Sequence, residues 1–148
     1  MRVGTTCLVM VLLATRFSSG VCAGDGTDIW DRVDHHFATN GDVKLHYVTL
    51  GQGKPVLFVH GFPDFWYSFR HQLQRLSGDY RTAAIDLRGY NKSDKPTGIE
   101  RYAFPLLLAD VNAVVNDLGG KVTLVGHDWG GALAWRFAMR YPQKWNGS

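Results

Sequence analysis

The sequence has few cysteines and no excess of either charge outside its first residues. Its two cysteines, Cys7 and Cys22, both lie in the first 23 residues. A chain that begins at residue 24 therefore has neither a disulfide nor a thiolate metal site, and its stability must come from packing. Of the 16 Lys and Arg residues, Arg2 and Arg16 lie in the same segment, which leaves 14 against 13 Asp and Glu. This balance gives no support to nucleic-acid binding.

The first 23 residues have the layout of a secretory signal peptide. Arg2 precedes an apolar run over residues 7–14, and small residues follow up to Ala23. The run is too short to span a bilayer, so we expect cleavage after Ala23 and no membrane contact afterwards. The protein would then be secreted, to an extracellular or periplasmic space. The alternatives are an uncleaved anchor and a misassigned start codon.

The rest of the chain alternates short apolar runs with helical patterns and shows neither internal repeats nor low-complexity segments. This alternation predicts an α/β fold, with helices on both faces of a sheet that is largely parallel after its first hairpin. We expect a signal peptide over 1–23, a lead-in over 24–32 and one domain over 33–148. The expected strands lie before residue 40, over 43–50 and 55–59, and within 80–89 and 121–128; the expected helices cover 65–76, 104–120 and 129–142.

A strand-to-helix turn lies in the stretch "LVGHDWGGALAW", with Asp128 at its centre. Many hydrolases place a serine there, in a strained backbone conformation that needs small residues two positions before and after it. Gly126 and Gly130 supply these, and Gly131 follows. A carboxylate with a reference pKa of about 3.9 is ionised at neutral pH and can attack a saturated carbon without a base. The alternative is that Asp128 is an ordinary helix N-cap.

A second motif, His60-Gly61-Phe62-Pro63, follows the apolar strand over 55–59. The stretches "HGFPDFWYSFRHQL", "DLRGYNKSDKP" and "GHDWGGALAWRFAMRYP" occur in the order and spacing of one family. With them the chain resembles the α/β-hydrolases of the epoxide hydrolase type along most of its length after residue 23. The resemblance implies an α/β-hydrolase fold and the opening of a small-molecule epoxide to a diol, without a metal or cofactor.

The resemblance also implies roles for individual residues. Asp128 would be the nucleophile, which forms an alkyl-enzyme ester, and the backbone N–H groups of Phe62 and Trp129 would be the oxyanion hole. His60, Gly61 and Pro63 would shape the oxyanion loop (residues 60–63), Pro63 through a cis peptide bond. The strand-to-helix turn around Asp128 would be a nucleophile elbow, and its glycines would be Gly126, Gly130 and Gly131.

Two related families differ at residues that favour an epoxide. Haloalkane dehalogenases resemble this chain at Asp128 and Trp129 but carry a side-chain donor at the position of Phe62. Fluoroacetate dehalogenases carry arginines at the positions of Trp129 and Ala132. Asn91 stands where the epoxide hydrolase type has glycine, and we interpret it as tolerated because Asn also adopts a positive φ. A haloalkane dehalogenase relative is kept as an alternative.

In this family the base is a histidine, which is paired with an acidic residue, and tyrosines of a cap domain serve as the acid. All of these residues follow the helix that comes directly after the nucleophile. Only residues 129–148 follow Asp128 here, and none of them is a histidine. We therefore expect about the first five of eight strands of the fold and a polypeptide that is inactive by itself, because hydrolysis of the ester needs a base. The strand before Asp128 would be an open edge to which a partner can bind. We favour a chain cut short from a complete hydrolase over a short product that acts through binding.

Histidines elsewhere are expected to have packing or hydrogen-bonding roles. His60 and His127 flank the two motifs, but alternation along a strand turns them away from the nucleophile. His35 and His36 lie beside Asp34 without further ligands, so no metal site is expected.

Overall fold

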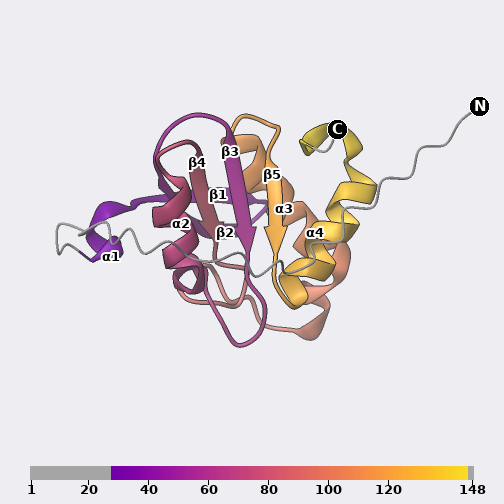
Figure 1. Cartoon of the computed structure of the whole chain (residues 1–148). Coiled ribbons are helices and arrows are strands. Elements are labelled where there is room, and N and C mark those ends of the chain that lie inside the picture. Colours follow the sequence, from indigo (N-terminus) through magenta and orange to yellow (C-terminus); the bar gives the residue numbers. More distant parts are fainter. Residues whose placement is uncertain (1–27, 147–148) are drawn as a thin grey trace, which may run out of the picture.

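The computed structural model describes residues 28–146, and its centre is a mixed sheet of five strands (Figure 1). The spatial order is β1-β2-β4-β3-β5, with β1–β2 and β2–β4 antiparallel and β3–β4 and β3–β5 parallel. The sheet is thus parallel after its first hairpin, as the sequence predicts, and β3, β4 and β5 end at the same edge. The strands are β1 (Asp34–Asn40), β2 (Val43–Leu50), β3 (Pro55–Val59), β4 (Arg81–Ile85) and β5 (Thr123–Gly126).

Helices cover both faces of the sheet, which explains why the inner strands read as continuous apolar runs. In Figure 1, α2 lies in front of the sheet and α3 behind it. Side chains of α3 and α4 pack on one face around Leu57 and Ile85. Side chains of α1 and α2 pack on the other face around Phe58 and Ala84. The α-helices are α1 (Ile29–Arg32), α2 (Arg70–Leu76), α3 (Phe104–Asp117) and α4 (Trp129–Arg140); the 3-10 turns are Trp66–Phe69, Ile99–Tyr102 and Pro142–Lys144.

The helix expected over 65–76 begins later than its apolar spacing suggests. Phe65 is extended, with φ −155° and ψ −178°. The backbone N–H of Trp66 is bound by the side chain of Asp86 at 3.0 Å. Residues 66–69 then form a 3-10 turn, and only Arg70–Leu76 is α-helical. A distant carboxylate therefore binds the first residue of the 3-10 turn that precedes this helix.

The lead-in contains a short helix that the sequence pattern did not predict. Asp28 caps α1 by accepting the N–H of Trp30 at 3.1 Å. Ile29 is buried, and the Trp30 ring lies 4.9 Å from the ring of Trp66. The expected signal peptide and residues 24–27 of the lead-in lie outside the described residues. No helix within 28–146 is long and apolar enough to cross a membrane.

The open edge expected at the last strand is only partly open. Within the described residues β5 has no neighbour on its outer side. Just before it, however, Val122 pairs with Trp145 in a parallel bridge. The N–H of Val122 donates to the carbonyl of Lys144 at 3.0 Å, and the N–H of Asn146 donates to Val122 at 2.8 Å. The chain after α4 thus returns beside β5 and occupies the start of its edge.

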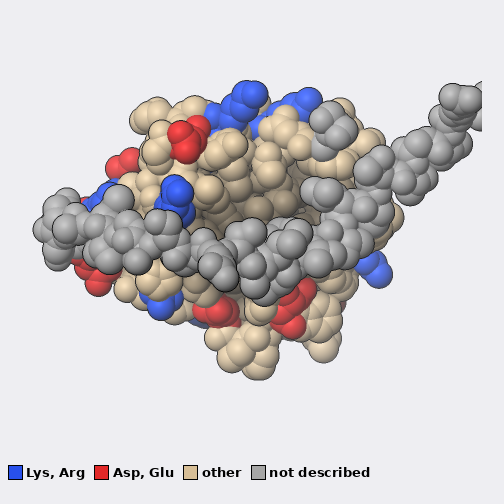
Figure 2. Space-filling view, in the orientation of Figure 1, with Lys and Arg blue, Asp and Glu red and all other residues tan. Residues whose placement is uncertain are grey.

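Charge on the described surface is mixed. In the view of Figure 2, basic and acidic side chains both appear around the margin of the molecule, and neither sign covers the visible face. This distribution agrees with the balanced composition after residue 23.

Candidate active site

Asp128 lies in a strained turn between β5 and α4 and is not an ordinary N-cap. Its φ is 54° and its ψ is −122°, and its side chain makes no capping hydrogen bond to the helix. An N-cap residue has an extended backbone and a side chain that accepts from the first turn. Positive φ in a residue other than glycine is uncommon and costs about 1–3 kcal/mol. The turn therefore has the conformation that the sequence motif predicts for a nucleophile elbow.

Two of the three elbow glycines are required by close backbone approach. A Cβ on Gly126 would collide with the backbone of Gly130, and a Cβ on Gly130 would collide with the carbonyl of Val59 at the end of β3. Gly131 is different, because the nearest atom to its Cβ position is 3.5 Å away. A side chain would therefore collide at Gly126 and Gly130, the two positions at which the motif calls for a small residue, whereas Gly131 has room for a Cβ.

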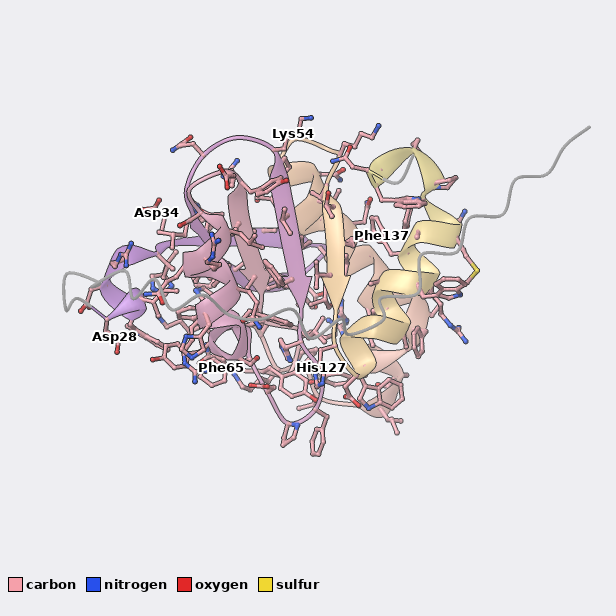
Figure 3. All side chains as sticks on the ribbon, in the orientation of Figure 1. Asp28, Asp34, Lys54, Phe65, His127 and Phe137 are labelled. Carbon is pink, nitrogen blue, oxygen red and sulfur yellow. The ribbon has the colours of Figure 1, made fainter. Side chains whose placement is uncertain are left out.

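The oxyanion loop meets the elbow because β3 and β5 are parallel neighbours, with Val59 opposite Gly126. Figure 3 places His127 at the end of the sheet to which β3 and β5 point, opposite the end that carries Lys54. The backbone N–H of Phe62 donates to Oδ1 of Asp128 at 3.0 Å. The peptide bond between Phe62 and Pro63 is cis.

Gly61 gives the loop its close approach to the elbow. A Cβ at this position would collide with the side chain of Asp128. The loop is also turned back on itself, since the N–H of Asp64 donates to the carbonyl of Gly61 at 3.2 Å.

Backbone dipoles favour the ionised form of Asp128. The N–H of Phe62 and, to a smaller extent, that of Trp129 lower the pKa of this carboxyl below its ordinary value of 3.8. Asp128 is exposed among the described residues, so burial opposes this effect only weakly. The site thus holds a carboxylate that is charged at neutral pH and that accepts a hydrogen bond from the N–H of Phe62, one of the two donors expected for the oxyanion hole.

Both ring nitrogens of His60 make hydrogen bonds to the backbone. Its Nε2 accepts the N–H of Leu87 at 3.0 Å, so its proton is on Nδ1, which lies 2.7 Å from the carbonyl of Gly61. Its side chain is 1% exposed, and this burial lowers its pKa below 6.5. His127 is exposed, and its backbone N–H donates to Val59. Within residues 28–146 no histidine side chain is hydrogen-bonded to Asp128.

A buried polar cluster that the sequence pattern did not predict lies beside the loop. Asp86 is 0% exposed and accepts from His46 at 2.6 Å and from Asn91 at 2.8 Å. Asn91 has the positive φ, 39°, that its residue type allows. Asp86 stood in the stretch "DLRGYNKSDKP", but nothing in that pattern indicated its partners, because His46 is 40 residues away.

The paired histidines serve cross-strand contacts. His35 Nδ1 lies 2.7 Å from His46 Nε2, and His36 Nε2 lies 2.9 Å from the hydroxyl of Thr49. No group of three metal-ligating side chains occurs in the part of the chain that the structure describes.

The sheet order and the elbow define an α/β-hydrolase, and the family comparison agrees. Residues 54–146 match the model of the alpha/beta hydrolase fold family. Among relatives, the chain is 43% identical over 136 residues to epoxide hydrolase 4 of Mus musculus, and the aligned part covers 88% of this chain and 36% of the relative. It is 50% identical over 104 residues to epoxide hydrolase 1 of Caenorhabditis elegans, covering 68% of this chain and 26% of the relative.

Solved structures give the same answer. An epoxide hydrolase from Vigna radiata superimposes with a TM-score of 0.76 at 39% identity, over 79% of this chain and 39% of that one. The Bacillus megaterium epoxide hydrolase in complex with an inhibitor gives 0.71 at 47% identity, over 74% and 39%. The chain therefore belongs to the epoxide hydrolase family of the α/β-hydrolase superfamily. It spans between 26% and 39% of the length of these relatives and structures.

Proposed function

We propose that the protein containing these residues opens epoxides to diols through an ester on Asp128. The observation that carries the proposal is the strained Asp128, whose carboxylate accepts the N–H of Phe62 at 3.0 Å. The names of the relatives support an epoxide as the substrate. A charged carboxylate at a sharp turn, with no capping function, suits attack on a saturated carbon.

The chemistry proceeds in two steps. An oxygen of Asp128 attacks one epoxide carbon, the carbon–oxygen bond of the ring breaks, and the released oxygen takes a proton from an acid. Water then attacks the ester carbonyl and gives up a proton to a base, while the N–H groups of Phe62 and Trp129 hold the oxyanion. Cleavage of the ester releases the diol and restores the carboxylate.

The acid and the base are expected outside these residues. No histidine follows Asp128 in this sequence, and within residues 28–146 the side chain of neither His60 nor His127 is hydrogen-bonded to Asp128. We propose that a polypeptide limited to residues 24–148 does not turn over. Ester hydrolysis without a base would be slower by about 10²–10⁴-fold.

Mass spectrometry of the peptide that carries Asp128 tests this function. The complete protein, mixed with an epoxide and quenched within one turnover, should show the mass of the substrate added to that peptide. Asp128→Ala should show neither the adduct nor the diol. Diol production without any adduct would contradict the ester route.

Halide release from a haloalkane, with no action on epoxides, would favour the dehalogenase alternative, which shares the Asp128-Trp129 pair.

Two further proposals concern the native polypeptide. We propose that it is secreted after removal of residues 1–23, and N-terminal sequencing of the mature protein should begin at Gly24. We also propose a complete hydrolase longer than 148 residues. Detection of the native protein with an antibody should show a mass well above 16.5 kDa. A native product ending at Ser148 would instead favour binding of a partner along β5.

A further inference from the structure

One turn of the chain after β4 holds both ends of the segment that carries the oxyanion loop. At the start of this segment, Nε2 of His60 accepts the backbone N–H of Leu87 at 3.0 Å. At its end, the backbone N–H of Trp66 donates to Oδ1 of Asp86 at 3.0 Å. Asp86 and Leu87 are consecutive residues. The position of this turn therefore sets the position of residues 60–66 as a unit.

The turn is itself fixed by a buried hydrogen-bond network. Nδ1 of His46 on β2 donates to Oδ2 of Asp86 at 2.6 Å, and both side chains are 0% exposed. The hydroxyl of Ser93 donates to the backbone carbonyl of Asp86 at 2.6 Å and accepts the backbone N–H of His46 at 2.8 Å. Rotation of the carboxylate would leave buried donors unpaired, which is strongly unfavourable. The network thus holds Asp86 in one orientation.

We propose that Asp86 and His46 are positioning residues for the N–H of Phe62. They contact neither Phe62 nor Asp128 and act through the two attachment points of the segment over 60–66. The inference rests on the proposed function, in which this N–H stabilises the oxyanion during ester hydrolysis. An oxyanion-hole donor works only when it is held at the developing charge, and a displacement of about 1 Å costs on the order of 100-fold in rate.

Three substitutions at His46 and a neighbouring histidine separate positioning from packing. His46→Phe fills the space but removes the donor to Asp86. His46→Asn restores a nitrogen donor near the position of Nδ1. His36→Phe is the matched control, because His36 also bridges two strands of the sheet, through Thr49 at 2.9 Å, but has no contact with Asp86. Asp86→Asn is the direct test, because an amide has only one acceptor oxygen, so its NH2 group would face either the donor of His46 or the N–H of Trp66.

The measurements use the complete protein. Labelling with ¹⁵N-phenylalanine gives an amide signal for Phe62, which a Phe62→Leu variant assigns. His46→Phe and Asp86→Asn should move this signal, whereas His36→Phe should leave it in place. In rapid-quench kinetics, His46→Phe and Asp86→Asn should each slow hydrolysis of the Asp128 ester by about 10- to 100-fold. The KM of each should stay within about twofold of the value for the unsubstituted protein. His46→Asn should recover most of the lost rate.

Each outcome decides the proposal. A Phe62 amide that stays in place in both His46→Phe and Asp86→Asn would overturn it. So would a His46→Asn variant as slow as His46→Phe, since that result assigns His46 to packing alone. If Asp86→Asn does not fold, the two His46 variants decide, because they leave Asp86 in place. If the unsubstituted protein opens no epoxide, the proposed function fails, and the amide signal, which needs no substrate, still tests the positioning role.

Discussion

The backbone N–H of Phe62 points at Oδ1 of Asp128, 3.0 Å away, although the two residues are 66 positions apart in the chain. They meet because β3 and β5 are parallel neighbours that end at the same edge of the sheet. Parallel strands bring the loops at their carboxyl ends together, and this is where α/β sheets place their ligand sites. The contact explains why glycine occupies position 61, where any side chain would collide with Asp128.

The close packing of the elbow predicts different effects for two adjacent glycines. Gly130→Ala places a methyl group against the backbone of Val59, which cannot move without disturbing β3. We expect the free energy of unfolding, measured with urea, to fall by about 3 kcal/mol or more. Gly131→Ala is the control, since its Cβ would be 3.5 Å from the nearest atom. It should be neutral or stabilising by up to about 1 kcal/mol, because alanine favours a helix. Equal effects at both positions would contradict the packing described here.

The strain at Asp128 predicts a trade-off, in which a substitution that relieves the strain raises stability and abolishes activity. Asp128→Gly relieves a positive φ of 54° and should raise the free energy of unfolding by about 1 kcal/mol, while it removes the nucleophile. Asp128→Ala removes the same carboxylate but keeps the unfavourable φ, so it should give no such gain. Both variants should be inactive. Thermal unfolding of the two variants in parallel gives the comparison, and a more stable alanine variant would argue against strain.

The strand and helix pattern of this fold follows from local features of the sequence, and much of the site does not. The apolar run over 55–59 and the glycines around Asp128 are patterns within short stretches of the sequence. For this reason β3 and the elbow can be predicted. The contact between His46 and Asp86 joins residues 40 positions apart through side chains. Polar contacts at that distance leave no periodic pattern. The bridge between Val122 and Trp145 leaves no periodic pattern either, because it is a single backbone pairing outside the strands.

The lowered pKa values of two histidines predict a loss of stability in acid. Desolvation, the main cause for both, lowers the pKa of the buried His60 and, only in part, that of the exposed His35 below 6.5, the value for an unfolded chain. Below pH 6.5 the unfolded chain therefore binds more protons than the folded one, and stability falls as the pH falls. Their contribution is complete above pH 6.5 and decreases down to the folded pKa values. Urea unfolding between pH 8 and pH 5 measures this slope.

A substitution that cannot titrate isolates one of these two groups. His35→Gln should make the loss between pH 6.5 and pH 5 shallower, because glutamine takes up no proton. The charge of Lys92 adds to the partial desolvation of His35 in lowering its pKa, so high salt should weaken this part of the effect. A steeper loss in His35→Gln would contradict the assignment.

Two ion pairs of the fold differ in burial and should differ in energetic effect. Arg88 and Asp110 are 2% and 0% exposed at their side chains, and Arg88 Nε donates to Asp110 at 2.5 Å. Asp110→Ala would leave the guanidinium buried without its partner and should lower the free energy of unfolding by about 3–5 kcal/mol. Arg101 and Asp42 pair at 2.7 Å, but Asp42 is 75% exposed, so Asp42→Ala should cost less than about 1 kcal/mol.

The buried pair also links the loop after β4 to α3. Asn40 donates to the same Asp110 carboxylate at 2.8 Å, so this carboxylate fastens the β1–β2 turn as well. Restoring charge balance should therefore restore stability only in part. In the double variant Asp110→Ala, Arg88→Met the loss should shrink but stay above about 1 kcal/mol, because Asn40 loses its acceptor. Full recovery in the double variant would show that the unpaired charge was the whole cost. A chemical-denaturation cycle over the wild type, both single variants and the double variant distinguishes the two outcomes.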